Sequence, residues 1–157
     1  MIEWNKLHQS LKDSESFSIF KKQLLKIIRP SENSIYDCND AVGIKFITRL
    51  RLGLSHLREH KFKHNYQDTL NPICSCGRDT ETTSHFLLHC PNYVNERMIL
   101  LNTIRAIDSS ILDLDENQIT ETLLYGNNLL RKTINTSILN ATINFLICTK
   151  RFDESLL

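Results

Sequence analysis

Hydrophobic residues recur three or four positions apart along most of this chain, which is the spacing of one face of an α-helix. In the N-terminal part this spacing predicts a short helix over 1–12 and a longer helix over 14–28, which ends before Pro30. The polar stretch 31–40 predicts a connector. Strand-like structure is expected only as a small turn or hairpin around the clustered cysteines. The pattern therefore predicts a mostly α fold.

The segment 41–64 predicts a helix with one apolar and one basic face. Its apolar residues recur at spacings of three and four, and basic residues fall on the opposite side at about 100° per residue. Gly53 is a place where this helix can be interrupted. The apolar face consists of Ile47, Leu50, Leu54 and Leu57. The basic face consists of Lys45, Arg49, His56, His60 and Lys63.

Three further helices are predicted in the second half of the chain. The segment 94–108 is amphipathic, and the segment 115–126 begins with the capping residue Asp115 and ends at Gly126. The last helix is predicted over 129–150, with a continuous apolar seam. This seam consists of Ile134, Ile138, Ala141, Phe145 and Cys148. Together these segments predict an irregular helical domain.

Composition and charge narrow the function classes. A chain of 157 residues, 41% of them hydrophobic, can bury one modest core, and few glycines and prolines disfavour an all-β fold. The net charge of +1 conceals a basic region, because 45–64 holds six Lys or Arg and one Glu. By contrast, 101–157 holds five basic and seven acidic side chains. No apolar run reaches the roughly 18 residues that span a bilayer, and the first residues lack a signal-peptide core. A cytoplasmic or nuclear, reducing compartment and no membrane partner are expected.

Three cysteines and two histidines gather in the stretch NPICSCGRDTETTSHFLLHCPNY. A metal site, a disulfide and buried neighbouring thiols are the three candidate explanations. In a reducing compartment clustered cysteines more often bind metal, and five cysteines suit no closed disulfide framework. Zinc takes four ligands, commonly two from a tight turn and two from a nearby helix. Here Cys74 and Cys76 lie on a turn closed by Gly77, and a helix capped by Thr80 or Thr82 follows.

Two residues at the end of that helix, His89 and Cys90, are candidates for the fourth zinc ligand. His85 and His89 lie one turn apart on the same face, whereas Cys90 lies about 140° from His85 around an ideal α-helix. Ligation by Cys90 requires the last turn to unwind, which Pro91 favours. Thiolate is the stronger zinc ligand, so we favour Cys90 and keep His89 as the alternative. The favoured set is Cys74, Cys76, His85 and Cys90. Such a site has no open position and indicates a structural ion.

The sequence from the basic helix to the cysteine cluster resembles a known family. ITRLRLGLSHLREHKFK followed by NPICSCGRDTETTSHFLLHCPNYVNERMILL resembles the region downstream of the reverse transcriptase domain in non-LTR (LINE-type, jockey-like) retrotransposon polyproteins. The family pattern is an R-L-R-x-G helix, a C-x-C-G turn, an E-T-x-x-H helix, a C-P pair and a trailing arginine. The opening IEWNKLHQSLKDSESFSIFKKQLLK resembles the segment that closes the thumb side of the polymerase. The matching positions are Arg49, Leu50, Arg51, Gly53, Cys74, Cys76, Gly77, Glu81, Thr82, His85, Cys90, Pro91 and Arg97.

The resemblance implies a C-terminal module of a retrotransposon reverse transcriptase, with a small CCHC zinc-knuckle-like insertion, that binds template RNA or target DNA. It implies no catalytic activity, since the chain lacks the adjacent Asp-Asp pair of the polymerase. The expected parts, within one compact domain, are 1–40 at the end of the thumb-side region, 41–97 with the basic helix and zinc motif, and 98–157 with the C-terminal helices. The expected phosphate contacts are Lys45, Arg49, Arg51, Arg58, Lys61 and Lys63.

Two other interpretations are open. Charged residues opposite an apolar stripe are usually only a solvated helix face, and Arg49 and Arg51 could instead tie this helix to the zinc loop. The module could also be structural, with zinc stapling helices that dock on the reverse transcriptase domain of the same polyprotein or on a host protein. The apolar faces of 17–28 or 134–148 would then make that contact. A continuous basic surface favours nucleic acid, whereas arginines held in internal contacts favour the scaffold.

Overall fold

The computed structural model describes residues 35–152, and the helices predicted at 1–12 and 14–28 lie outside the described residues. Within 35–152 the chain is mostly helical and contains no strand, so the predicted helical fold class is confirmed. Ile73 and Thr80 form an isolated antiparallel bridge. The α-helices are α3 (Ala41–Arg51), α4 (Arg58–Lys63), α5 (Val94–Ile107), α6 (Glu116–Tyr125) and α7 (Lys132–Cys148). The shorter elements are the 3-10 turns η2 (Ile35–Asp37), η4 (Pro91–Tyr93) and η5 (Ser109–Asp113), and the π-helical turn η3 (His85–His89).

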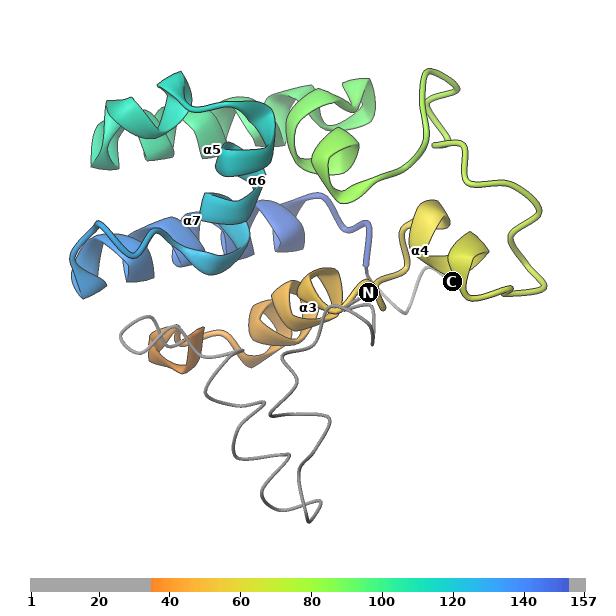
Figure 1. Cartoon of the computed structure of the whole chain (residues 1–157), viewed down its shortest axis with the longest axis horizontal. Coiled ribbons are helices and arrows are strands. Elements are labelled where there is room, and N and C mark those ends of the chain that lie inside the picture. The colour runs from red at the N-terminus through yellow and green to blue at the C-terminus, as the bar shows by residue number, and fades with distance from the viewer. Residues whose placement is uncertain (1–34, 153–157) are drawn as a thin grey trace, which may run out of the picture.

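The helix α7 is central to the described part of the chain. Figure 1 shows it between α5 and α3, and it also packs against α6. Its predicted apolar seam is confirmed at Ile138 and Phe145, which are buried, whereas Cys148 is exposed. Because α7 has neighbours on several sides, residues outside the seam are buried as well. Neither α7, with 17 residues, nor any other described helix is long and apolar enough to cross a membrane.

The crossing of α3 and α7 depends on Gly43. The two helices approach so closely that a Cβ atom at position 43 would lie 2.1 Å from Cγ2 of Ile143. Carbon atoms at that distance overlap strongly, so a side chain there would force the helices to shift. Asp40 caps the start of α3, since its Oδ1 accepts a hydrogen bond from the Gly43 N–H at 2.7 Å. The first turn of α3 is therefore held both by its cap and by contact with α7.

The helix predicted over 41–64 is interrupted at Gly53, as the sequence allowed. Gly53 adopts a φ of +67°. Its N–H donates to the Leu50 carbonyl at 3.1 Å, and the next N–H along the chain donates to the Arg49 carbonyl at 2.8 Å. This pair of bonds is a Schellman motif, which ends a helix and requires a residue that tolerates positive φ. The chain therefore leaves α3 and turns before α4 begins.

Beyond Gly53 the faces predicted for one continuous helix are wrong at Leu54 and His60. Leu54, expected on the apolar face, is 53% exposed, whereas Leu57 is fully buried. His60, expected on the basic face, is buried, and its Nδ1 lies 2.7 Å from the hydroxyl of Ser55. Burial also lowers the pKa of His60 below its ordinary value. The faces were assigned for an unbroken helix, and the turn after Gly53 gives α4 a different direction.

The helix α6 begins and ends where the sequence predicted. The Asp115 carboxylate accepts from the Gln118 N–H at 2.9 Å, and the Gln118 side chain accepts from the Asp115 N–H at 3.3 Å, which completes a capping box. Gly126 ends the helix with a φ of +78°. Asn135 is fully buried, and its amide bonds both the N–H and the carbonyl of Asn127. These bonds hold the loop that leads into α7.

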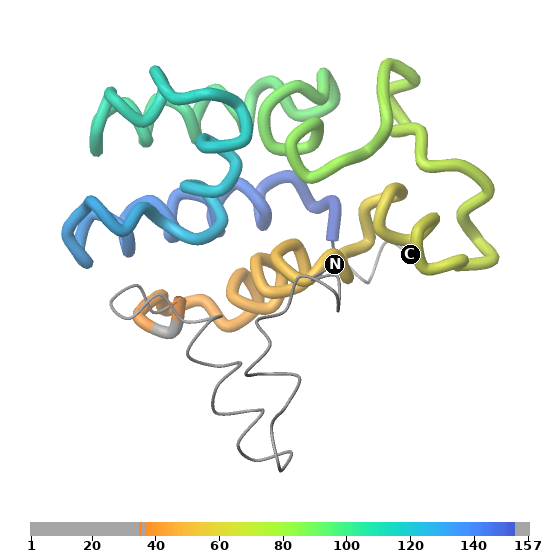
Figure 2. The backbone as a smooth tube through the Cα atoms, in the orientation of Figure 1, coloured from red at the N-terminus to blue at the C-terminus, as the bar shows by residue number. Residues whose placement is uncertain are grey.

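The segment that carries the first two clustered cysteines extends away from the packed helices, as Figures 1 and 2 show. From 64 to 82 it contains no helix, and the bridge between Ile73 and Thr80 is its one pairing of strand type. The position of this segment therefore depends on side-chain contacts and on any ion that it binds.

Replacing Gly43 by Ala is expected to lower the free energy of unfolding by about 1–3 kcal/mol, because the new methyl group overlaps Ile143. In a helix alanine is more favourable than glycine by about 1 kcal/mol, so helix propensity alone would make the variant more stable. A loss of stability would therefore come from the overlap with Ile143. Urea denaturation measures the change. Thr48→Ala on the exposed side of α3 is the matched control and should change stability by less than about 0.5 kcal/mol. Equal stability of Gly43→Ala and the parent would contradict the close crossing.

Candidate metal centre

The turn that carries Cys74 and Cys76 is closed by backbone hydrogen bonds. The Gly77 N–H donates to the Cys74 carbonyl at 2.9 Å, and Gly77 adopts the positive φ predicted for it, +75°. The Arg78 N–H then points at the sulfur of Cys76, with a nitrogen–sulfur distance of 3.5 Å. An N–H directed at sulfur stabilises a thiolate, as expected for a turn that supplies metal ligands.

The helical turn that follows is a π-helix, not an α-helix that unwinds. Thr82 caps it, since its hydroxyl accepts from the His85 N–H at 3.0 Å. The Cys90 N–H donates to the His85 carbonyl, five residues earlier, at 2.7 Å. A π-turn contains one more residue than an α-turn, so it brings the fifth residue close to the first. We expected the last turn to unwind before Pro91, and the structure has a widened turn there. As in the expected case, Cys90 lies close to His85.

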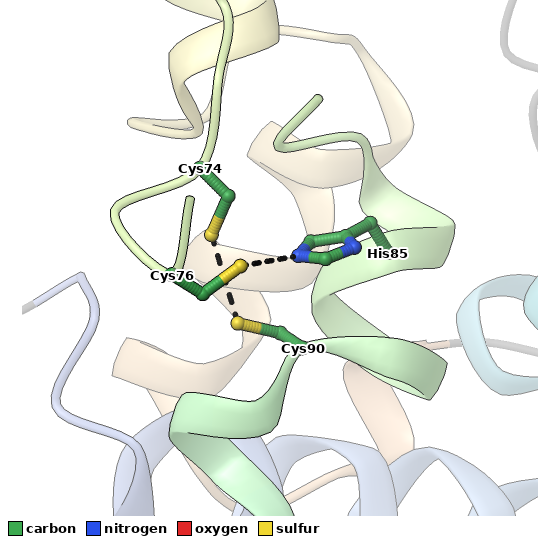
Figure 3. A group of neighbouring side chains, drawn as sticks. All are labelled: Cys74, Cys76, His85 and Cys90. Carbon is green, nitrogen blue, oxygen red and sulfur yellow. Dashed lines mark hydrogen bonds between the residues drawn. The ribbon is translucent and has the colours of Figure 1, made fainter. Parts of the chain in front are cut away.

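The structure brings together the four predicted ligands of the favoured set, Cys74, Cys76, His85 and Cys90. Their ligand atoms all lie within 4.8 Å of one another, and Figure 3 shows the sulfurs and the imidazole turned toward a common centre. The Cys74 and Cys90 sulfurs are 3.6 Å apart, and the Cys76 sulfur lies 3.4 Å from Nε2 of His85. Tetrahedral zinc would place two sulfurs about 3.8 Å apart and a sulfur and nitrogen about 3.6 Å apart. The four residues are therefore close enough to bind a metal ion, and the distances are compatible with zinc.

His89, the alternative fourth ligand, is engaged elsewhere. Its side chain is exposed, and its Nε2 lies 3.0 Å from a carboxylate oxygen of Glu116 at the start of α6. The Ser84 hydroxyl donates to the same carboxylate, and together these contacts lower the pKa of Glu116. The π-turn thus directs Cys90 toward the cysteine turn and His89 toward α6.

Burial and hydrogen bonding affect the three thiols differently. Burial raises the pKa of Cys74 to about 12 and also raises the pKa of Cys90. The Arg78 N–H lowers the pKa of Cys76. Burial lowers the pKa of His85, which favours the neutral imidazole that a metal requires. Without a cation the two buried thiols keep their protons, and a bound cation would displace them.

Arg97 fastens the end of the π-turn. Its guanidinium is buried and donates to the Leu87 carbonyl at 3.0 Å and to the Cys90 carbonyl at 2.5 Å. The Cys90 carbonyl also accepts from the Tyr93 N–H at 3.3 Å, so the arginine adds a second bond there and supplies a partner for the Leu87 carbonyl near the end of the π-turn. Arg97 is the trailing arginine of the family pattern. Its contacts with the Leu87 and Cys90 carbonyls give a physical reason for an arginine at this position.

A buried carboxylate joins the cysteine turn to two helices. Glu81 is 1% exposed and receives two hydrogen bonds of 2.8 Å from the guanidinium of Arg151. The Arg58 N–H donates to the same carboxylate at 2.7 Å, and Arg151 also donates to the His56 carbonyl. Sequence reasoning missed Arg151, because no local pattern connects it to a partner 70 positions earlier.

The six residues predicted to contact phosphate lie on two helices, α3 and α4, and one of them is engaged inside the protein. The Arg51 guanidinium donates to the Leu124 carbonyl at 2.5 and 2.8 Å and lies 4.9 Å from the centre of the Tyr125 ring. It therefore ties α3 to α6, whereas the sequence allowed a tie to the zinc loop. Lys45 is exposed on α3, and Arg49 beside it on that helix is half-buried.

The other three lie on α4, which begins at Arg58. Lys61 forms an ion pair with Asp68. Lys63 forms an ion pair with Glu59 at 2.6 Å. The basic residues are thus divided between two helices, and the lysines on α4 contact carboxylates at the surface.

Comparison of this chain with family models, with curated proteins and with solved structures finds no match. The resemblance to the C-terminal region of non-LTR retrotransposon reverse transcriptases therefore stays a prediction that rests on the motif residues themselves. The four-residue cluster stands independently of that resemblance, because it follows from the positions of the side chains.

Proposed function

We propose that this chain is a zinc-stapled helical module that binds nucleic acid and has no catalytic activity of its own. The observation that carries the proposal is the convergence of four ligand atoms at distances compatible with tetrahedral zinc. Three thiolates and one imidazole form a donor set that suits zinc. Cys74 and Cys76 with His85 and Cys90 form a CCHC, knuckle-like insertion in the helical domain. Because side chains of the protein fill all four positions, the ion is structural.

The zinc ion joins a weakly supported segment to the core. Two ligands come from the turn at Cys74 and Cys76, within a segment that has no helix from 64 to 82. The other two flank Phe86 and Leu87, which are fully buried in the core cluster. Ligation therefore connects an extended loop to a packed turn. The metal's binding free energy, on the order of 10 kcal/mol in small zinc domains, becomes folding free energy for that loop.

The nucleic-acid surface is proposed to lie on α3 and α4. The family resemblance supports it, and so do the lysines of α4, of which Lys63 is exposed and Lys61 half-buried. Lys61 pairs with the exposed Asp68, and the exposed Lys63 pairs with Glu59. Ion pairs that water can reach contribute little, so phosphate oxygens can replace those carboxylates. Arg51 is left out of the contact set because its guanidinium donates to Leu124. The proposed phosphate contacts are Lys45, Arg49, Arg58, Lys61 and Lys63.

This surface is linked to the metal site. The Arg58 N–H at the start of α4 donates to Glu81, which follows the cysteine turn in the chain. Movement of the metal loop therefore affects the first turn of α4. Under this proposal zinc positions the binding surface without contacting nucleic acid.

A second candidate function is protein interaction, and α5 favours it. Val94, Met98 and Ile99 on α5 are each more than half exposed, and a row of exposed apolar side chains on one helix is typical of a docking surface. The zinc would then only staple the helices, which dock on a reverse transcriptase domain or a host protein. The predicted alternative face at 134–148 fits this role less well, because Ile138 and Phe145 are buried within the protein.

Protein purified without chelator is expected to contain about one zinc per chain, measured by elemental analysis. Cys90→Ser should lose the metal, because it removes one of four ligands, whereas His89→Ala should keep it. Cys148→Ser is the matched control, since Cys148 is exposed and outside the cluster. A parent protein with much less than one zinc would sink the proposal, and loss of metal only in the His89 variant would reassign the fourth ligand.

Removal of zinc by a chelator is expected to accelerate amide exchange across the metal loop while the centre of α7 stays protected. The reporters in the loop are the N–H groups of Cys74, Gly77 and Glu81, which donate to carbonyls of the same loop. The reporters in the core are Thr142 and Leu146, which are buried on α7. Hydrogen exchange read by mass spectrometry or NMR makes the comparison. Equal protection of the loop with and without metal would show that zinc does not hold it.

Binding to nucleic acid is expected to weaken with salt, with a slope of log K against log salt between about −2 and −4. Replacing Lys45, Lys61 and Lys63 by Gln should lower affinity at least about tenfold at low salt and flatten the slope by about 2. The matched control replaces Arg105, Arg131 and Lys132 by Gln, an equal loss of charge on α5 and near the start of α7. Fluorescence anisotropy measures both. If the two triple variants bind alike, the basic residues of α3 and α4 are only a solvated surface.

A further inference from the structure

Two aromatic side chains on α4 and the turn after it are exposed beside lysines. Phe62 is 44% exposed and Tyr66 is 55% exposed, and neither belongs to the buried core cluster. The other aromatic side chains that the structure describes are buried or half-buried. The exposed rings stand in the segment KFKHNY, residues 61–66, which also contains Lys61, Lys63 and His64.

The turn that carries Tyr66 is ordered by its own hydrogen bonds. Asn65 adopts a φ of +55°, and the Tyr66 N–H donates to the Lys61 carbonyl at 3.1 Å. This places the Lys61 ammonium 5.8 Å from the centre of the Tyr66 ring. The His64 imidazole lies 3.2 Å from the Gly53 carbonyl, which ties the turn to the end of α3. The ring and the charge are therefore held in a defined relation.

Exposed rings and cations together match the chemistry of an unpaired nucleic acid. Every nucleobase has an apolar face on which an aromatic ring can stack, and the phosphates between bases attract lysine. In a duplex the base faces are covered by neighbouring base pairs, and the grooves offer only base edges. An aromatic ring at a protein surface can therefore stack with bases of a single strand but not with those of an intact duplex.

We propose that Phe62 and Tyr66 stack on bases of a single-stranded nucleic acid whose phosphates are contacted by Lys61 and Lys63. This inference rests on the proposed function and narrows it, because it assigns the partner as single-stranded and the contact as a base face. Binding of this kind depends little on sequence, since each base offers a face of similar character. The lysines set the salt dependence, and the rings set the preference for bases over bare phosphate.

The test compares three ligands with the full chain in its zinc-bound form. They are an oligothymidylate of roughly ten nucleotides, the same strand in a duplex, and an abasic sugar-phosphate strand of equal length. The parent is expected to bind the oligothymidylate at least about fivefold more tightly than the abasic strand. Phe62→Leu and Tyr66→Leu should each weaken oligothymidylate binding about five- to hundredfold, and should leave the abasic strand and the duplex unchanged.

Two further variants control the test. Phe62→Trp keeps an aromatic face and should retain the preference for bases, whereas Leu70→Ala removes an apolar side chain that is 87% exposed and should change nothing. Zinc content and melting temperature should match the parent in all variants, because the altered side chains are outside the core.

The outcomes separate this inference from the function on which it rests. One outcome is that the leucine variants bind oligothymidylate as the parent does, while the variant with Lys45, Lys61 and Lys63 replaced by Gln loses affinity. In that case the stacking proposal is wrong and the phosphate-binding proposal stands. If the parent binds the abasic strand as tightly as oligothymidylate, stacking is likewise wrong. If the parent binds none of the three ligands, both proposals are wrong, and the exposed rings then belong to a protein-docking surface.

Discussion

The carboxylate of Glu81 is the contact on which the arrangement of the described part of the chain depends. A charge that is 1% exposed is strongly unfavourable unless it is paired and its lone pairs are bonded. Arg151 supplies the opposite charge through two parallel hydrogen bonds, and the Arg58 N–H donates a third hydrogen bond to the Glu81 carboxylate. These partners follow α7 and begin α4, while Glu81 itself follows the cysteine turn. Removal of one partner would leave a buried charge uncompensated, so all three segments must take their places together.

Arg151 shares its mode of contact with two other arginines. Arg51 donates to the Leu124 carbonyl in the last turn of α6, and Arg97 donates to carbonyls at the end of the π-turn. Arg151 donates to the His56 carbonyl just before α4. Helix ends leave carbonyls without partners, and a guanidinium can reach two acceptors at once from a rigid planar group. Three of the basic residues in the described part of the chain are therefore used in internal contacts, and the small net charge gives no sign of that use.

The features predicted correctly from the sequence are those that neighbouring residues determine. The capping box at Asp115, the positive φ of Gly77 and the seam of α7 at Ile138 each follow from a few adjacent positions. The four clustered residues were also found, because their spacing lies within seventeen positions of one another. The π-turn was missed, since an α-turn and a π-turn differ by one residue and sequence spacing alone does not distinguish them. The contacts of Arg51 and Arg151 were missed because their partners lie 73 and 70 positions away.

These unequal separations have a consequence for the order in which the molecule can assemble. The contact between Cys74 and Cys90 spans 16 positions, whereas that between Glu81 and Arg151 spans 70. By loop-closure entropy alone the shorter closure is favoured by about 1 kcal/mol, and all four candidate ligands lie at or before Cys90. The helix α3 can reach its place only after α7 has been made, because α7 is the surface on which it packs. During synthesis on a ribosome, the four candidate ligands are therefore all available before α7, on which α3 packs, has been made.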